Sequence, residues 1–382
     1  MTIAFDVQHL LEDKKTGIGY HTEQLIRSLL TNHPDADYLF NFFAMKYAEQ
    51  KISKIKTLFS PQGEINPCTY FSYSLYKMIY SFVPLPPYRF FFDKQADVYH
   101  FFNFIAPPFV PGKIVLSIHD MVFKDLPETV NKKTSFYLKM NMAASIKRAD
   151  ALIVVSRFTQ ERLAHYYNTA DKQVVLIPNG VDLARFHPAG NTEKLRTTQK
   201  KYGIQSEYFI YVGTIEPRKN LERLIKGYAQ FARGRENPPQ LVLVGGKGWL
   251  DAAIFAACDH VPPEGNVLFT GYLDEDEIPE VLRGAIAMCF PSLYEGFGLP
   301  VLEAMACGTA VLTSHTTSLG EVAGNAAHLV NPLDEAEIAA GMVKLYEDKD
   351  YRNALALKGH ERAQQFTWDA AAQQLYEVYK HL

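Results

Sequence analysis

The hydrophobic pattern of the chain predicts an α/β protein. Apolar residues recur at helical spacing in several segments, as in Leu25, Ile26 and Leu29, which lie on one face of a predicted helix. Strands that alternate with helices pair in parallel, because the crossover between parallel strands needs a long connection. Short apolar runs of strand length separate the helical segments, at residues 3–7, 38–43, 98–102, 114–118, 151–155, 174–177, 208–212, 241–244, 267–270, 286–290 and 309–313.

The same pattern predicts more than one domain. A chain of 382 residues exceeds what one core usually supports. Residues 183–201 are polar and show no strand pattern, so we expect the hinge there. The expected parts are a Rossmann-like domain over 1–185, a second over 186–365 and a terminal helix over 366–382.

Composition narrows the class of protein. Hydrophobic residues make up 47% and charged residues 21% of the chain, with a net charge of −3, which indicates a globular protein and does not favour nucleic-acid binding. No apolar run reaches transmembrane length, and the first residues read as a strand rather than a signal peptide. The sequence therefore predicts a cytoplasmic protein.

Residues 286–313 carry the most chemical information. A strand, a glycine-rich loop, a helix beginning near Pro300 and a second strand follow one another. Gly296 and Gly298 allow close approach of the backbone to a ligand, and the helix N-terminus suits a phosphate. Glu295 and Glu303 repel phosphate but accept hydrogen bonds from sugar hydroxyls. The loop therefore predicts a nucleotide-sugar site.

This loop resembles a known motif. Glu295-x7-Glu303, within Tyr-Glu-Gly-Phe-Gly-Leu-Pro-x-x-Glu-Ala-Met-Ala-Cys-Gly, closely resembles the donor motif of the retaining family 4 glycosyltransferases. The resemblance implies the GT-B fold, in which two doubly wound domains face across a cleft and the last helix crosses back to the first domain. It further implies that the first domain, 1–185, binds the acceptor and the second, 186–365, binds the nucleotide-sugar donor. It also implies that Glu303 holds the donor ribose and Glu295 the hexose hydroxyls, in a donor loop that includes Gly296, Phe297, Gly298 and Leu299.

A second segment points to the same donor. Arg218 and Lys219 stand at the start of a predicted helix, where cations oppose the helix dipole, and a bound diphosphate would resolve that conflict. The resemblance assigns both to the donor diphosphate. Because they supply positive charge, we expect neither a metal nor another cofactor. Around them, the expected donor contacts are Gly213, Thr214, Gly246, Lys247 and Tyr272, with Tyr272 beside the nucleobase by resemblance.

The first half of the chain offers weaker signals. Gly17 and Gly19 lack the third glycine of a dinucleotide fingerprint, where this chain has Thr22, so a nicotinamide site is disfavoured. A flexible loop over the active site and an ordinary connection both remain open, while the resemblance places such a loop near the donor phosphates and the acceptor. His119 ends a predicted strand, and the resemblance implies that it contacts the donor sugar or phosphate.

Residues 70–92 are unusually aromatic, and two interpretations remain open. One is core packing. The other is an apolar surface that admits a lipid-linked acceptor or touches the inner face of the cell membrane, assisted by the five basic residues of 132–148.

Taken with the resemblance, these motifs predict a retaining hexosyltransferase. The signatures look most like the bacterial mannosyltransferase-like group that builds surface polysaccharides. GDP-mannose is the first expected donor and a UDP-hexose such as UDP-glucose the second, with a saccharide or lipid-linked glycan as acceptor. A nucleotide-sugar epimerase on the same fold and a non-catalytic sugar-nucleotide binding subunit are the alternatives.

Overall fold

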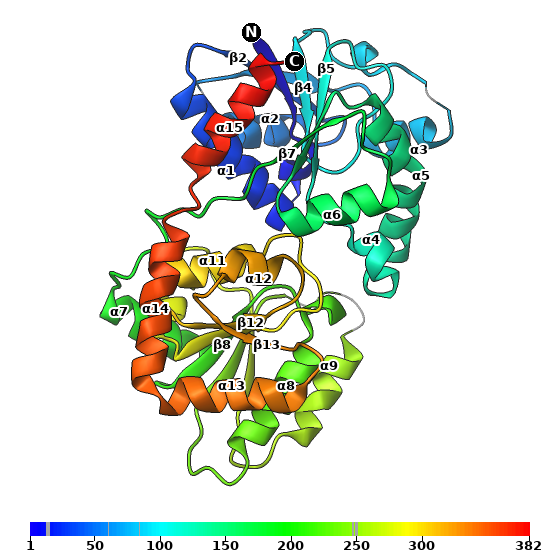
Figure 1. Cartoon of the computed structure of the whole chain (residues 1–382). Coiled ribbons are helices and arrows are strands. Elements are labelled where there is room, and N and C mark those ends of the chain that lie inside the picture. The colour runs from blue at the N-terminus through cyan, green and yellow to red at the C-terminus, as the bar shows by residue number, and fades with distance from the viewer. Residues whose placement is uncertain (13–15, 60, 84, 247, 249–250) are drawn as a thin grey trace. The chain divides into compact units, whose positions relative to one another are not determined.

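The computed structural model describes residues 1–12, 16–59, 61–83, 85–246, 248 and 251–382 (Figure 1). The chain forms two compact units. The first comprises Met1–Gly180 together with Trp368–Leu382, and the second is Val181–Thr367. The chain therefore leaves the first unit after Gly180 and returns to it at Trp368.

The first unit is built on a parallel sheet of seven strands in the order β3-β2-β1-β4-β5-β6-β7. The strands are β1 (Thr2–Asp6), β2 (Asp37–Phe43), β3 (Glu64–Cys68), β4 (Val98–Phe101), β5 (Lys113–Ile118), β6 (Ala151–Val154) and β7 (Gln173–Leu176). The helices are α1 (Gly17–Asn32), α2 (Ala48–Phe59), α3 (Tyr73–Phe82), α4 (Val122–Asp125), α5 (Lys132–Arg148), α6 (Arg157–Tyr166) and α15 (Trp368–Lys380), with 3-10 turns η1 (Gln8–Leu11), η2 (Tyr88–Phe90) and η3 (Pro127–Thr129).

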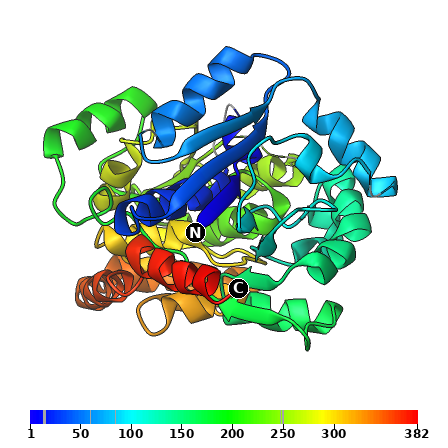
Figure 2. The same cartoon turned by 90° about the horizontal axis from the view of Figure 1, so that it is seen from above.

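The terminal helix α15 completes the first unit by packing against α1 (Figures 1 and 2). The ring of Tyr376 stacks on that of His33, with 3.7 Å between ring centroids. Deeper in the unit, the Tyr379 hydroxyl lies 2.6 Å from Nδ1 of His100 on β4. These contacts join the last helix of the chain to residues near its beginning.

The second unit is built on a parallel sheet of six strands in the order β10-β9-β8-β11-β12-β13. The strands are β8 (Tyr208–Val212), β9 (Gln240–Val244), β10 (Val267–Gly271), β11 (Ala287–Phe290), β12 (Val311–Ser314) and β13 (His328–Val330). The helices are α7 (Thr192–Tyr202), α8 (Leu221–Ala232), α9 (Ala252–Ala256), α10 (Ile278–Gly284), α11 (Leu299–Ala306), α12 (Thr317–Ala323), α13 (Glu335–Glu347) and α14 (Lys349–Ala363), with turns η4 (Pro217–Lys219) and η5 (Ala257–His260).

Both sheets confirm the predicted doubly wound architecture. In each sheet the strand order reverses beside the first strand, between β1 and β4 in one unit and between β8 and β11 in the other. Loops that leave neighbouring parallel strands at such a reversal diverge to opposite faces, and the crevice between them is where open α/β sheets bind ligands. The fold therefore directs attention to the segments that follow β1, β4, β8 and β11.

The structure adds local detail that the sequence pattern did not provide. The predicted hinge at 183–201 contains α7, which has Thr198 as its buried residue and so gave no apolar periodicity. Asn220 precedes α8 but its side chain does not cap it; the residue has a φ of 61°. Asp274 lies in the loop before α10, which begins at Ile278, and the Asp274 N–H donates to the Glu277 carboxylate at 3.2 Å.

The aromatic segment 70–92 divides between core and surface. Tyr76, Tyr80, Tyr88, Phe91 and Phe92 are buried in the core of the first unit. Exposed large side chains from the same segment are Tyr70, Leu75, Met78, Phe82, Val83, Leu85 and Phe90. Core packing is therefore confirmed for part of this segment, and the remaining large side chains are exposed.

Candidate functional site

The segments that follow β8 and β11 are joined at the strand-order reversal of the second unit. The Leu293 N–H donates to the Arg218 carbonyl at 2.9 Å. The side-chain amide of Asn220 donates to the carbonyls of Pro291 at 2.9 Å and Pro332 at 2.6 Å. Asn tolerates the left-handed conformation found here better than most residues do. Asn220 thus ties three segments together.

Both predicted cations bind the same predicted carboxylate. Arg218 Nη1 lies 2.9 Å from Glu295 Oε2, and Lys219 Nζ lies 2.6 Å from Glu295 Oε1. Arg218 also bonds through Nη2 to Glu216 at 2.7 Å and through Nη1 to the Tyr294 carbonyl at 2.8 Å. The four ionisable side chains form one network with two positive and two negative charges.

Burial makes this network electrostatically strong. Burial alone would raise the pKa of Glu295, but the charges of Arg218 and Lys219 outweigh it and the net shift is downward. Burial is also the main cause that lowers the pKa of Lys219, and the neighbouring Arg218 adds to it. The carboxylate therefore stays ionised between two cations, in surroundings where charge interactions are weakly screened.

Among the described residues, Lys219 uses fewer of its hydrogen-bond donors than Arg218 does. An ammonium group has three N–H donors, and the hydrogen bond that Lys219 makes among the described residues goes to Glu295. Arg218 is instead held by two carboxylates and a carbonyl. Lys219 is thus the better placed of the two to donate to an anionic ligand, and Arg218 fixes Glu295.

The glycine-rich loop before α11 has the backbone geometry that its sequence predicted. Gly298 has a φ of 103°, and a Cβ at this position would lie 2.6 Å from Cδ2 of Leu319. The residue stands at the N-cap of α11, whose first residues include Pro300. Gly296, Phe297 and Leu299 continue the same loop into the helix, and Phe297 is buried.

A second glycine turn meets the loop after β10. A Cβ on Gly246 would lie 2.0 Å from Cε2 of Tyr272, so the tyrosine ring rests against the glycine. The Gly246 carbonyl accepts from the Ile215 N–H at 3.0 Å, and the Gly213 N–H donates to the Val244 carbonyl at 2.9 Å. Gly213 and Thr214 thus lie beside the glycine turn that Tyr272 contacts. Lys247, which was predicted to bind the donor, is outside the described residues.

Glu303 has an environment unlike that of Glu295. It lies in α11 and is partly buried. Burial raises its pKa to about 7, an effect that the positive charge of Arg185 reduces and the negative charges of Glu275 and Asp182 reinforce. A carboxyl group with this pKa can either donate or accept a hydrogen bond near neutral pH.

Comparisons with known proteins agree with this geometry. Residues 196–362 match the family described as "Glycosyl transferases group 1", and residues 16–185 match "Glycosyltransferase Family 4". The O-antigen chain mannosyltransferase B of Escherichia coli is 30% identical over 290 residues, which cover 76% of this chain and 76% of that protein. The chain belongs to the family 4 glycosyltransferases.

Solved structures show the same GT-B fold as this glycosyltransferase. Sucrose-phosphate synthase from Thermosynechococcus elongatus superposes with a TM-score of 0.73 at 21% identity, covering 100% of this chain and 98% of that one. HepE from Anabaena, solved with UDP and glucose, gives a TM-score of 0.72 at 18% identity and covers 100% of both chains. The chain is a hexosyltransferase of the group that contains mannosyltransferases.

In the first unit, Gly17 and Gly19 belong to a helix and not to a flexible loop. Gly17 and Gly19 lie in the first turn of α1, where Thr16 accepts a hydrogen bond from the Gly19 N–H at 3.3 Å. A Cβ on Gly17 would meet no atom within 4 Å. The two glycines thus begin a helix of 16 residues.

His119 is part of a buried histidine cluster, which also contains His9, His21 and His100. Its Nε2 donates to the Phe102 carbonyl at 2.6 Å, and burial lowers its pKa to about 4. The ring is therefore neutral at physiological pH. His21 packs edge-on against it, with 4.8 Å between ring centroids. The sequence analysis predicted a role for His119 alone, whereas the structure places four histidines together.

Sequence reasoning missed two residues that hold the Glu295 network. Glu216 is 3% exposed and accepts from Arg218. The Ser318 hydroxyl donates to the Glu295 carbonyl at 2.9 Å and fixes the loop from the other side. Glu216 precedes Arg218 by two residues, and this spacing could have indicated the ion pair. No sequence pattern could have indicated Ser318, because its contact depends on the fold.

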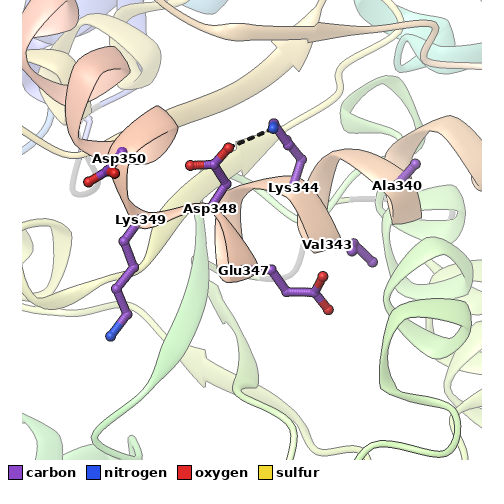
Figure 3. Close-up of a pocket in the computed structure, with 7 residues that line it drawn as sticks. All are labelled: Ala340, Val343, Lys344, Glu347, Asp348, Lys349 and Asp350. Atoms are coloured by element: carbon purple, nitrogen blue, oxygen red, sulfur yellow. Dashed lines mark hydrogen bonds and ion pairs between the residues drawn. The ribbon is translucent and has the colours of Figure 1, made fainter.

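A separate groove of the second unit lies at the junction of α13 and α14 (Figure 3). It shares no residue with the glycine loops or with the Glu295 network. Asp348 pairs there with Lys344 at 2.6 Å and accepts from the Tyr351 N–H at 2.9 Å, so it caps α14. The residues lining the groove are Ala340, Val343, Lys344, Glu347, Asp348, Lys349 and Asp350.

Proposed function

We propose that this glycosyltransferase moves mannose from GDP-mannose to a saccharide or lipid-linked saccharide acceptor in the synthesis of a surface polysaccharide, with retention of the anomeric configuration. The observation that carries the proposal is the sharing of Glu295 between Arg218 and Lys219 beside a glycine-rich helix start. The name of the mannosyltransferase to which the chain is similar supports the choice of sugar.

In this proposal each part of the donor meets a different group. Glu295 accepts hydrogen bonds from the hexose hydroxyls, and Glu303 binds the ribose. The Lys219 ammonium stabilises the diphosphate as its negative charge grows in the transition state, where preorganised electrostatics have most effect. The acceptor hydroxyl attacks from the side of the leaving group, and a diphosphate oxygen takes its proton. No divalent metal is required, because Lys219 supplies the positive charge.

A thermal unfolding series with GDP, UDP, ADP and NAD tests the donor. A ligand at a hundred times its dissociation constant stabilises by about 2.7 kcal/mol, which moves the midpoint by several degrees. We expect GDP to give the largest shift, and the shift to be unchanged in EDTA. The product formed from GDP-mannose should have the same anomeric configuration as the donor, measured by NMR. A shift with NAD alone would refute a sugar-nucleotide site.

UDP-glucose is the second candidate donor. HepE, whose structure is similar with a TM-score of 0.72, was solved with UDP and glucose. That complex supports UDP-glucose as the alternative donor. A shift with UDP and none with GDP would select this candidate.

We also propose that the first unit binds the surface of an anionic membrane. In the described part of the chain, no helix is both long and apolar enough to span a bilayer. However, α3 and α5 pack together, and residues 69–92 and 132–148 contain no Asp or Glu. The exposed apolar and basic side chains of these two segments include Leu75, Met78, Phe82, Val83, Leu85, Phe90, Phe136, Met140, Lys132, Lys133 and Lys139. Apolar side chains beside lysines suit an anionic bilayer.

Co-sedimentation with vesicles tests this surface. We expect the protein to bind phosphatidylglycerol vesicles, and binding to weaken in a Lys132→Glu/Lys133→Glu double variant, because each lysine contributes about 1 kcal/mol near an anionic surface. A Lys349→Glu variant changes an exposed lysine of the second unit and serves as the control. Equal binding of the double variant and the wild type would contradict the proposal.

A further inference from the structure

A buried carboxylate beside the donor loops has no role in the proposed transfer. Glu216 is 3% exposed and stands between the end of β8 and the turn η4. The glycine turn that follows β9 covers it, because a Cβ on Gly248 would lie 3.3 Å from the Glu216 Cβ, and the Gly248 N–H donates to the Ile215 carbonyl at 3.0 Å. Carboxylates are seldom buried to this extent without a charged partner, so the partner of Glu216 indicates what the residue does.

The partner is Arg218, which holds Glu216 and Glu295 with the same guanidinium group. Its Nη2 lies 2.7 Å from Glu216 Oε1. Its Nη1 donates to Glu295 Oε2 at 2.9 Å and to the Tyr294 carbonyl at 2.8 Å. The guanidinium group is planar and its N–H donors point in fixed directions. Glu216 therefore fixes Nη2, and with it the direction from which Nη1 holds Glu295.

Lys219 cannot replace this control of orientation. Its Nζ lies 2.6 Å from Glu295 Oε1, but an ammonium group is a point charge on a flexible side chain whose donors rotate. In the proposed transfer the same ammonium group also binds the diphosphate. The orientation of Glu295 in the donor complex then depends mainly on Arg218, and the orientation of Arg218 depends on Glu216.

A second buried ion pair of the same unit has a purely structural arrangement. Glu280 Oε1 lies 2.6 Å from Arg283 Nη2, and both side chains are at most 10% exposed. Arg283 uses its Nη1 for the His187 carbonyl, at 2.8 Å. The second nitrogen of Arg283 thus reaches the backbone, whereas that of Arg218 reaches Glu295, a carboxylate of the proposed donor site.

We propose that Glu216 is a positioning residue for recognition of the donor hexose: acting through Arg218, it holds the Glu295 carboxylate in the orientation that accepts hydrogen bonds from the sugar hydroxyls. The inference rests on the proposed function, which assigns those hydroxyls to Glu295, and adds the residue that orients the acceptor of these bonds. Hydrogen bonds weaken steeply as their angle departs from the preferred range, so a carboxylate that rotates loses affinity for the sugar. The nucleoside part of the donor contacts other groups, so its binding should not change.

Two substitutions of Glu216 and one control test this role. Glu216→Ala removes the bond to Arg218, whereas Glu216→Gln keeps the size of the side chain and an oxygen that accepts from Arg218. Glu280→Ala breaks the buried pair with Arg283 and is the matched control. The ligands are GDP-mannose and the β-methyl ester of GDP, which has the same charge but no sugar. A change of charge at residue 216 acts alike on both ligands, so the ratio of their affinities reports the hexose contacts.

Both affinities are measured by isothermal titration calorimetry on the full chain. We expect the preference for GDP-mannose over the ester to fall about 10-fold in Glu216→Ala, the lower part of the range for a hydrogen bond to a charged group, and about 2–3-fold in Glu216→Gln. Glu280→Ala should lower the unfolding midpoint and leave the preference unchanged. In an Arg218→Met background, Glu216→Ala should change the preference by less than about twofold, because the connection to Glu295 is already broken.

Other results overturn distinct statements. If Glu216→Ala weakens both ligands equally, or if its effect on the preference is the same with and without Arg218, Glu216 does not position Glu295. If the wild type binds GDP-mannose no more tightly than the ester, the proposed contact of Glu295 with the hexose fails, and the role of Glu216 fails with it. If the wild type binds neither GDP ligand but binds UDP-glucose, the proposed donor is wrong, and the same comparison of UDP-glucose with the β-methyl ester of UDP decides the role of Glu216.

Discussion

Replacing Lys219 with Met is expected to lower the turnover number by about 10²–10³, the effect of removing one preorganised donor from a developing oxyanion. Among the described residues, the hydrogen bond of the ammonium group goes to Glu295, and the group keeps further donors for a ligand. The loss should appear in kcat and in kcat/KM, because the interaction strengthens only as the diphosphate departs. Initial rates with GDP-mannose, measured as GDP release in the presence of acceptor, provide the test.

The matched control is Lys226→Met. Lys226 belongs to the adjoining helix α8 and pairs with Glu222 at 2.7 Å, outside the Glu295 network. We expect this variant to retain wild-type turnover. Near-normal turnover in Lys219→Met, with the control unchanged, would contradict the role proposed for Lys219.

Arg218→Ala separates positioning from charge stabilisation. This change leaves Glu216 without its arginine partner and Glu295 with Lys219 alone, so we expect the free energy of unfolding to fall by about 3–5 kcal/mol in addition to a loss of turnover. Lys219→Met should lower stability less, because Arg218 still neutralises Glu295. An Arg218→Ala enzyme of near-normal activity would refute both roles.

The first unit is expected to lose stability as the pH falls below 6.5. Burial lowers the pKa of His9 to about 3 and of His119 to about 4, and lowers those of His21 and His100 well below 6.5. Between these values and 6.5, the unfolded state binds protons that the folded state excludes, so the free energy of unfolding decreases with decreasing pH. For His119 alone the full effect is about 3 kcal/mol.

One carboxyl group of the same unit acts in the opposite direction. The pKa of Asp6 rises from 3.8 to about 7, so its folded form binds a proton that the unfolded form releases, and this contribution to stability is lost as the pH rises towards 7. The effect of this one carboxyl group on stability offsets only part of the effect of the four histidines. The net expectation is a lower unfolding midpoint at pH 5.0 than at pH 7.5.

The measurement needs a probe confined to the first unit. The chain has two tryptophans, so in a Trp249→Phe background the fluorescence reports Trp368 at the start of α15. His100→Gln should flatten the pH dependence, because one buried neutral histidine has been removed. His165→Gln, at an exposed position of α6, is the control. An unfolding midpoint that does not change between pH 7.5 and 5.0 would contradict the expectation.

The sequence alone predicted the architecture, because strand-length apolar runs and helical periodicity record which residues are buried. It also predicted the glycine loops, since close backbone approach and a φ of 103° at Gly298 favour a residue without a side chain. Elements without apolar periodicity were not predicted. Helix α7 is almost entirely polar, and Gly17 and Gly19 look like loop residues although they begin a helix.

Only the tertiary structure decided how these parts combine. Lys219 and Glu295 are 76 residues apart and meet because β8 and β11 are neighbours in the sheet. Likewise, Asp6, Tyr76 and Tyr137 surround one cavity because β1, α3 and α5 converge. The sequence determines which residues are apolar, flexible or charged, and therefore the fold class and the donor loops. The pairing of charges and the enclosure of a cavity depend on distances between remote segments, which local periodicity does not encode.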